Sequence, residues 1–372
     1  MKIVVTVGCR PDCIKMMPLV KELKRRKAFD VFLLSTGQHK EMLRQVFEAF
    51  NEYPDFDLSI MQPNQNLFDI TERILVSAKK VLEDLKPDVV LVHGDTSTAF
   101  AVSLACFYLH IPVGHVEAGL RTYNLESPFP EEFNRQCVGL LSKYNFAPTS
   151  LAQKNLLNEG KNPKSIFVTG NTIVDAMHYT VKENYENDEL KWVGNSKFIL
   201  ITAHRRENLG KPMENMFKAI RRVLDEHPDV KAIYPIHMNP IVQSCAKKYL
   251  GDCNQIHLIP PIDVFDCHNF ESRCYLCLTD SGGIQEECPA YGKPVLVMRD
   301  TTERPEGIKA GTLKLVGTSE ENIYKWFTTL LDNEDEYKKM ALAVNPYGDG
   351  KASIRIADIL EGLEYKPFMS NE

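Results

Sequence analysis

Short apolar runs that alternate with amphipathic stretches constrain the fold of this chain more than any other feature. In the first half the runs cover residues 3–7, 31–35, 89–93, 113–116 and 165–168, and in the second half they cover residues 198–202, 231–235, 256–258, 275–279 and 294–298. Near-continuous Val, Ile and Leu runs separated by helical segments indicate parallel strands that are covered on both faces. We therefore predict an α/β protein built on parallel sheets.

The chain length and one polar interval indicate two domains. A chain of 372 residues exceeds what one hydrophobic core usually serves. Residues 182–197, KENYENDELKWVGNSK, are polar and lack the pattern of either sheet, which is typical of a linker. We expect two Rossmann-like, doubly wound domains that face a cleft, one in residues 1–170 and one in residues 171–351. A C-terminal helix within residues 352–372 is expected to pack back on the first domain.

Composition excludes several classes of function. The net charge of −6 offers no basic surface for nucleic acid or an anionic membrane, and no apolar run approaches the roughly 20 residues that span a bilayer. We expect no signal peptide, because Met1 leads directly into a strand. The CxxC from Cys274 to Cys277 lies in an expected strand, where side chains three apart face opposite ways. We therefore expect free thiols, no metal site and a cytoplasmic location.

Polar clusters follow several of the expected strands. They read GCRPDCIK after the first strand, HGDT at the end of the third, EAGLRT after the fourth, AHRREN after the first strand of the second half, and TDSGGIQEE after the strand at 275–279. Parallel sheets bind ligands at the carboxyl ends of their strands. Together the clusters predict one site.

The residues of these clusters divide into two kinds of chemistry. Cations and N–H groups that suit a pyrophosphate are those of Arg10, Lys15, His204, Arg205, Gly282 and Gly283. Carboxylates that can act as general acids or bases are Asp95, Glu117 and Glu131, while Glu287 can accept hydrogen bonds from ribose hydroxyls. The chain lacks the GxxxxGK[ST] and GxGxxG loops, which disfavours P-loop ATP hydrolysis and dinucleotide oxidoreduction. A nucleoside diphosphate that carries a sugar fits both sets.

Each cluster also has a structural interpretation, which the sequence leaves open. Asp95 can belong to a helix cap, and Glu117 can form an ion pair with Arg121. Paired glutamates such as Glu286-Glu287 can simply complement a helix dipole. No single cluster is specific, so the prediction of a site depends on their joint placement.

Nearly the whole chain, from Lys2 to about Leu363, carries the motifs of a known family in the same order: GCRPDCIKMMPL, LVHGDTST, HVEAGLRT, SPFPEEFNRQ, VTGNTIVDA, ITAHRRENLG, TDSGGIQEE and RDTTERPEGIKAGT. They closely resemble the non-hydrolysing UDP-N-acetylglucosamine 2-epimerases of bacteria. The resemblance implies a glycosyltransferase-B type fold, a homodimer, and interconversion of UDP-GlcNAc and UDP-ManNAc without metal or nicotinamide. It also implies elimination of UDP to a 2-acetamidoglucal, re-addition of UDP, and a product for cell-surface polysaccharides such as the linkage unit of teichoic acids.

The resemblance assigns roles to the candidate residues. Asp95, Glu117 and Glu131 serve the two faces of the sugar, with the face of each left open, and His204 contacts phosphate oxygens. The diphosphate is expected at a helix N-terminus, where Glu286 only complements the dipole. The substrate-binding residues that it implies are Arg10, Lys15, Arg135, Ser281, Gly282, Gly283 and Glu287.

A second, activating UDP-GlcNAc site beside the active site is implied for many members of this family. The matching residues here are Gln38, Glu41, Asn64, Gln65, Glu131, Arg205 and His237. We expect the family pattern to place a glutamine at 41 and an arginine at 64, so this chain gains a carboxylate and loses a cation. One lost charge-assisted hydrogen bond lowers affinity roughly ten- to a hundred-fold, so we expect weakened activation unless Lys40 compensates.

The first motif of this chain departs from the pattern of the family. The first motif of the family usually reads GTRPEAIK, so Cys9, Asp12 and Cys13 are departures, and we expect an inert thiol at Cys9 rather than an oxidation-sensitive one.

The alternative functions are those of an epimerase of the same family that acts on another UDP-amino sugar, a glycosyltransferase of the same fold, and an inactive nucleotide-sugar sensor.

Overall fold

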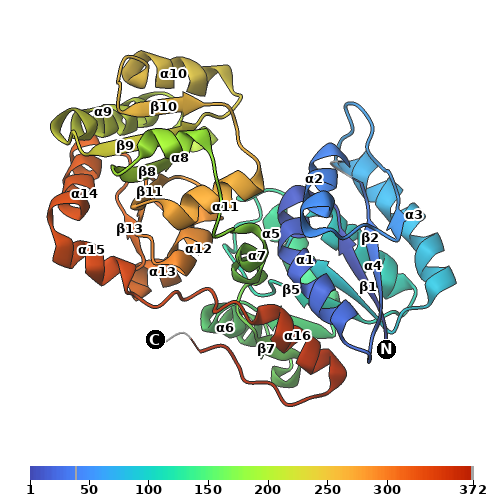
Figure 1. Cartoon of the computed structure of the whole chain (residues 1–372). Helices are drawn as coiled ribbons and strands as arrows, with labels where there is room; N and C mark the ends of the chain where they lie inside the picture. The colour runs from blue at the N-terminus through green and yellow to red at the C-terminus, as the bar shows by residue number, and fades with distance from the viewer. Residues whose placement is uncertain (38–39, 370–372) are drawn as a thin grey trace. The chain divides into compact units, whose positions relative to one another are not determined.

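The protein divides into two compact units, each with its own parallel sheet. The structure is a computed structural model that describes residues 1–37 and 40–369, apart from the side chains of residues 40–42. In the described part of the chain, unit 1 comprises Met1–Tyr179 and residues 347–369, and unit 2 comprises Thr180–Pro346. Helices lie on either side of each sheet (Figure 1). No helix in this described part combines the length and the apolar character that crossing a bilayer requires.

The sheet of unit 1 has the strand order β3-β2-β1-β4-β5-β6-β7, with every pair parallel. Its strands are β1 (Lys2–Val7), β2 (Asp30–Ser35), β3 (Phe56–Asp57), β4 (Val89–His93), β5 (Val113–Val116), β6 (Tyr144–Ala147) and β7 (Ile166–Val168). Its helices are α1 (Arg10–Arg25), α2 (Lys40–Phe50), α3 (Leu67–Leu85), α4 (Ser97–Tyr108), α5 (Glu131–Leu141), α6 (Ser150–Asn158), the 3₁₀ turn η1 (Pro163–Ser165), α7 (Thr172–Thr180) and α16 (Ala352–Glu361).

The sheet of unit 2 has the order β10-β9-β8-β11-β12-β13, again with parallel pairs. Its strands are β8 (Lys197–Thr202), β9 (Val230–Pro235), β10 (Ile256–Ile259), β11 (Leu276–Thr279), β12 (Val295–Val297) and β13 (Leu313–Leu315). Its helices and 3₁₀ turns are α8 (Asp188–Val193), η2 (Arg206–Asn208), α9 (Lys211–Glu226), α10 (Pro240–Leu250), α11 (Val264–Arg273), α12 (Ile284–Glu287), η3 (Cys288–Tyr291), α13 (Pro305–Ala310), α14 (Glu320–Asp332) and α15 (Glu334–Ala341).

The predicted α/β class is confirmed, and the strand order explains where sites can form. In unit 1 the order reverses between β1 and β4, and in unit 2 it reverses between β8 and β11. At such a switch point the connecting segments leave in opposite directions, which opens a crevice beyond the carboxyl ends of the strands. The central strands β1 and β4 are almost wholly buried, so their residues belong to the core and only the segments that follow them can bind a ligand.

The structure differs from the prediction at short elements and at the change of unit. Three strands, β3, β6 and β13, were not predicted, because they hold two to four residues and lack a long apolar run. The chain changes unit after Tyr179 rather than after residue 170. The reason is that Asp175 of α7 accepts hydrogen bonds from the backbone N–H groups of Ala352 and Ser353, at 3.1 and 2.7 Å, within unit 1. The expected linker carries α8, which Asn187 caps.

Gly8 is required by the close packing of the turn from β1 to α1. A Cβ atom at this position would lie 1.9 Å from Oγ1 of Thr98 and 2.7 Å from Oγ1 of Thr36. Only glycine lets the backbone pass there. This close approach sets the start of α1, and therefore the positions of Arg10 and Lys15.

Candidate active site

The first group of site residues lies in unit 1, beyond the carboxyl ends of β1 and β5. Nζ of Lys15, on α1, donates to Oε2 of Glu117, which directly follows β5, at 2.5 Å. The amide Nδ2 of Asn171 donates to the same oxygen at 2.8 Å. Both charged side chains are about nine-tenths buried. A carboxylate that accepts from a cation and an amide is stabilised in its ionised form, so the structure holds Glu117 as an oriented carboxylate.

The backbone of Glu117 is strained. Its carboxylate does not form the ion pair with Arg121 that the sequence left open. Its φ of +66° lies in the left-handed region, which residues other than glycine use sparingly. Such strain is concentrated at functional sites. The alternative ion pair with Arg121 is wrong, because Nε of Arg121 lies 2.6 Å from Oε1 of Glu159. Glu117 is therefore available to the site.

Asp95 supplies a second carboxyl group, beyond the end of β4, and its side chain is 25% exposed. Its Oδ2 lies 2.7 Å from Nη2 of Arg135 on α5. Burial raises the pKa of Asp95 to about 6, although Arg135 opposes the shift. The proposed capping role belongs to Thr96, whose hydroxyl accepts from the N–H of Ala99 at 3.1 Å. Asp95 can therefore exchange a proton near neutral pH.

Two adjacent glutamates begin α5, and they differ in environment. Glu132 is fully buried and accepts hydrogen bonds from the backbone N–H groups of Thr122 and Tyr123, at 2.9 and 3.0 Å. Glu131 is only half-buried, and its charge raises the pKa of Asp95. Glu132 is thus a structural residue, whereas Glu131 belongs to the group around Asp95.

His93, the last residue of β4, was not singled out from the sequence. Its side chain is 5% exposed, and its Nε2 lies 3.7 Å from Oε2 of Glu117. Burial lowers the pKa of His93 to about 4, so the ring is neutral at pH 7. A neutral imidazole therefore lies beside the Glu117 carboxylate. The sequence could have pointed to His93, because it is the last residue of an expected strand and directly precedes other site residues.

The second group lies in unit 2 and is organised by Asp280, which follows β11. This residue is fully buried, and its Oδ2 accepts from the backbone N–H groups of His204 and Arg205, both at 2.9 Å. Its Oδ1 lies 3.5 Å from Nδ1 of His204. The His204 ring stacks on that of His237, with centroids 5.3 Å apart. Burial lowers the pKa of His204, and Asp280 opposes the shift.

Gly282 is flanked by two guanidinium groups. A Cβ atom there would lie 3.1 Å from Nη1 of Arg304 and 3.6 Å from Nη2 of Arg205. A Cβ atom on Gly283 would lie 3.0 Å from Oε1 of Glu287. The serine-glycine turn, Ser281 to Gly283, is thus bordered by two cations and by the carboxylate expected to bind ribose. Two cations at an open backbone suit a diphosphate.

The helix that follows this turn is shorter than expected, and Glu286 has a different role. Helix α12 is a single turn, because Pro289 supplies no N–H to continue it and the chain passes into η3. Its dipole is accordingly small, and Arg205 and Arg304 supply the positive charge instead. Glu286 is buried and accepts from Nε of Arg304 at 2.8 Å. The interpretation of Glu286 as a mere complement to a dipole is therefore wrong.

The residues expected at an activating site fall partly outside the described part of the chain. Gln38 lies outside the described residues, and so does the side chain of Glu41. Asn64 has a φ of +59° and is exposed. Oε1 of Gln65 lies 3.5 Å from Nη1 of Arg73, so a guanidinium is present next to position 64. Of the other members, Glu131 begins α5 in unit 1, whereas Arg205 and His237 lie with His204 in unit 2.

Comparison with known proteins identifies the family. A family described as UDP-N-acetylglucosamine 2-epimerase matches residues 21–361. A UDP-N-acetylglucosamine 2-epimerase of Bacillus subtilis is 57% identical over 360 residues, which are 97% of this chain and 95% of that protein. The chain belongs to the UDP-N-acetylglucosamine 2-epimerase family. Members of this family are isomerases.

Solved structures of relatives show the same fold and carry nucleotides. The complex of Staphylococcus aureus MnaA with UDP superposes with a TM-score of 0.91, at 49% identity, over 99% of this chain and 100% of that one. The UDP-GlcNAc 2-epimerase of Neisseria meningitidis, bound to UDP-GlcNAc, has a TM-score of 0.88 at 46% identity, over 97% and 99% of the two chains. The two-domain Rossmann-like fold of these epimerases is therefore the fold of this chain.

The unusual first motif of this member preserves the geometry of α1. Asp12 is buried, and its carboxylate accepts from the backbone N–H groups of Gly8 and Cys9, at 3.1 and 2.9 Å, which satisfies the start of the helix. Burial raises the pKa of Asp12 to about 6. Burial also raises the pKa of Cys9 well above its usual value, with Asp12 adding to the shift. The thiolate is disfavoured, which agrees with an inert thiol.

Other residues were missed because their roles depend on distant partners. They are His93, Asn171, Asp280 and Arg304. Asn171 and Arg304 stand in quoted motifs, VTGNTIVDA and RDTTERPEGIKAGT, which was the available signal. Among the described residues, His268, Glu271 and Glu287 have side-chain ligand atoms within 4.8 Å of one another. That spacing alone does not make a metal site, because a shared proton also satisfies adjacent carboxylates.

Proposed function

We propose that this chain interconverts UDP-GlcNAc and UDP-ManNAc by inverting C2 of the sugar. The observation that carries the proposal is the pair of carboxyl groups, the partly buried Asp95 and the buried Glu117, beyond adjacent strands in a chain of this epimerase family. A relative bound to UDP-GlcNAc supports the choice of substrate. The same proposal includes a cytoplasmic homodimer whose product supplies cell-surface polysaccharide, including teichoic acid linkage units, as the resemblance implies.

Unit 2 supplies groups for the nucleotide. Arg205 and Arg304 border the turn at Gly282 and can neutralise a diphosphate. His204, neutral when the site is free, gains a proton more readily when an anion binds, because Asp280 already favours its charged form. Glu287, folded over Gly283, can accept hydrogen bonds from ribose hydroxyls. These groups stabilise UDP both as part of the substrate and as a leaving group.

The proposed reaction is an elimination followed by an addition. The bond between C1 and the diphosphate oxygen breaks, its electron pair leaves on UDP, and a base removes the C2 proton. The resulting C1–C2 double bond is that of 2-acetamidoglucal. UDP then adds back to C1 while an acid delivers a proton to the opposite face of C2. This route avoids a carbanion at C2, which has no adjacent carbonyl to stabilise it.

The carboxyl groups of unit 1 suit the two proton transfers. Inversion needs a base on one face of the sugar and an acid on the other. Glu117 is held as a carboxylate by Lys15 and Asn171, whereas the pKa of Asp95 is raised to about 6. We propose that these two residues, with Glu131, exchange the C2 proton. A UDP-hexose transferase would need no such pair beside its donor sugar.

Incubation with UDP-GlcNAc tests the proposal. Proton NMR is expected to show UDP-ManNAc approaching an equilibrium mixture with UDP-GlcNAc from either starting sugar. Absence of UDP-ManNAc, together with turnover of another UDP-amino sugar, would favour the same-family alternative. Transfer of the sugar to an acceptor would favour a glycosyltransferase.

We also propose that activation by a second UDP-GlcNAc is weakened in this chain. The reason is the carboxylate at Glu41 and the neutral side chain at Asn64. Arg73, 3.5 Å from Gln65, is the cation that can offset part of the loss. Reaction started from pure UDP-ManNAc is expected to proceed at a substantial rate without added UDP-GlcNAc. A strict requirement for micromolar UDP-GlcNAc would contradict this.

A further inference from the structure

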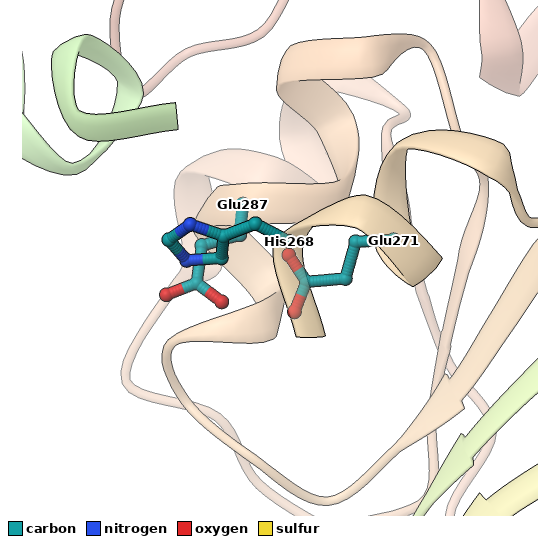
Figure 2. A group of neighbouring side chains, drawn as sticks. All are labelled: His268, Glu271 and Glu287. Atoms are coloured by element: carbon teal, nitrogen blue, oxygen red, sulfur yellow. The ribbon is translucent and has the colours of Figure 1, made fainter. Parts of the chain in front are cut away.

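A buried carboxyl group, Glu271, lies beside the glutamate assigned to ribose binding. Glu271 and His268 project from α11, and Glu287 projects from α12. Figure 2 shows the three side chains gathered at one place in unit 2. The ligand atoms of the three side chains lie within 4.8 Å of one another. Glu271 has no part in the site described above, and the mechanism does not use it.

The environment of Glu271 does not compensate an ionised carboxylate. The side chain is fully buried. Within the described part of the chain its Oε1 accepts from Sγ of Cys267 at 3.1 Å, and its Oε2 has no hydrogen-bond partner. Nδ1 of His268 is engaged with Oγ1 of Thr180 at 2.7 Å. A buried carboxylate that lacks a cation is costly, and it becomes neutral by taking up a proton.

The titratable groups around Glu271 are mostly thiols, with a histidine, a tyrosine and a second carboxyl group. They are Cys267, His268 and Cys274 from α11 and its end, Cys277 from β11, Glu287 from α12, and Cys288 and Tyr291 from η3. Two cations act on other members of this cluster: Lys293 opposes the raised pKa of Cys274, and Arg273 opposes that of Tyr291. Burial, followed by the charge of Glu287, raises the pKa of Glu271 well above its usual range.

We propose that Glu271 is a positioning residue that shares one proton with Glu287. The Glu271 carboxyl donates the shared proton in a hydrogen bond to Glu287, which keeps Glu287 singly charged and fixes its orientation toward ribose hydroxyls. The proposal rests on the proposed function, in which Glu287 binds the ribose. Two carboxyl groups that share a proton titrate as a pair.

A dependence of nucleotide affinity on pH follows. As pH rises through the pKa of the pair, the shared proton is lost, the two carboxylates repel each other, and Glu287 loses its fixed position. The dissociation constant for UDP should then rise by up to about tenfold for each further pH unit. Glu271→Gln places a neutral N–H donor at the same position, and it cannot lose that proton in this range.

The experiment compares the UDP affinity of wild type, E271Q and E271A by calorimetry between pH 7.5 and 9.5. The terminal phosphate of UDP is ionised across this range. The uracil N3 proton titrates toward its alkaline end, but it does so equally for every variant, so the shared proton is measured by the difference between the profiles of wild type and E271Q. E271Q is expected to bind UDP as tightly as wild type at pH 7.5 and to weaken less steeply than wild type as pH rises, because only the titrations of His204 and of uracil remain. E271A lacks the donor and is expected to bind about fivefold more weakly at pH 7.5, with the same shallower pH dependence as E271Q. The control Glu189→Gln removes a carboxylate that contacts only a histidine, His257, and should keep the wild-type profile.

Thermal unfolding without UDP tests the shared proton separately from the proposed function. The pKa of Glu271 is raised in the folded state, so the stability that its protonation supplies is present at pH 4 and is lost as pH rises through the folded pKa. The melting temperature of wild type should therefore fall relative to that of E271Q between pH 5 and pH 9. If UDP failed to bind at any pH while this difference appeared, the proposed function would fail and the shared proton would stand.

Three results would overturn the proposal. Parallel pH profiles for wild type and E271Q, in both affinity and melting temperature, would show that Glu271 holds no shared proton. A pH dependence of UDP affinity that became shallower in His268→Gln but not in E271Q would place the proton on His268. A difference between wild type and E271Q that disappears in EDTA would assign the three side chains to a metal ion.

Discussion

Glu117→Gln is expected to lower turnover by roughly 10²–10⁴-fold, the usual contribution of a positioned acid or base. The carboxylate has a fixed orientation, set by Lys15 at 2.5 Å and Asn171 at 2.8 Å, and the amide of glutamine cannot accept a proton. The variant also leaves the ammonium group of Lys15 without its partner, so a lower melting temperature is expected as well. Steady-state kinetics and circular dichroism separate the two effects.

A matched control distinguishes catalysis from the loss of an ion pair. Glu159→Gln removes the carboxylate that pairs with Arg121 at 2.6 Å in the same unit, and it should keep near-full turnover. A Glu117→Gln protein that remained folded and retained activity comparable to this control would assign Glu117 to the structure alone.

His204→Ala is expected to lower turnover by roughly 10²–10³-fold, as the loss of one oxyanion donor does in other enzymes. The ring is held by the stack on His237 and by Asp280, whose Oδ1 lies 3.5 Å from its Nδ1. Burial lowers the pKa of His204, which favours a neutral ring in the free protein, and we expect the ring to gain a proton when the diphosphate binds. UDP affinity should accordingly fall on replacement, and the affinity of wild type should weaken as pH rises.

The control for this variant is His257→Ala. His257 is a histidine of the same unit that stacks on Trp192 at 3.5 Å and contacts Glu189, away from the turn at Gly282. Its replacement should leave turnover within about twofold. Equal turnover in the His204 and His257 variants would remove His204 from the site.

The sequence was sufficient to predict the strands with long apolar runs and the places where the site residues follow them. Strand β4 was predicted with its observed bounds, Val89–His93, because its apolar run is continuous and ends at a polar cluster. Asp95 and Glu117 were located by the rule that parallel sheets bind ligands at the carboxyl ends of their strands. Both inferences use only local pattern and topology.

The pairing of charges could not be predicted, because it depends on contacts far apart in the chain. Glu117 pairs with Lys15, 102 positions away, and not with the nearby Arg121. Glu286 pairs with Arg304 for the same reason, although its place in the first turn suggested the helix dipole. Burial has the same character: nothing local distinguishes Glu271, which is fully buried, from a solvated helical glutamate.

Reaction of UDP-GlcNAc in deuterated water tests the central claim most directly. If C2 is inverted by elimination and re-addition, the proton lost from C2 exchanges with solvent before the opposite face is protonated. The UDP-ManNAc formed should therefore carry one deuterium at C2, detected by mass spectrometry and by loss of the C2 proton signal. UDP-ManNAc that forms at the normal rate without deuterium at C2 would contradict the mechanism.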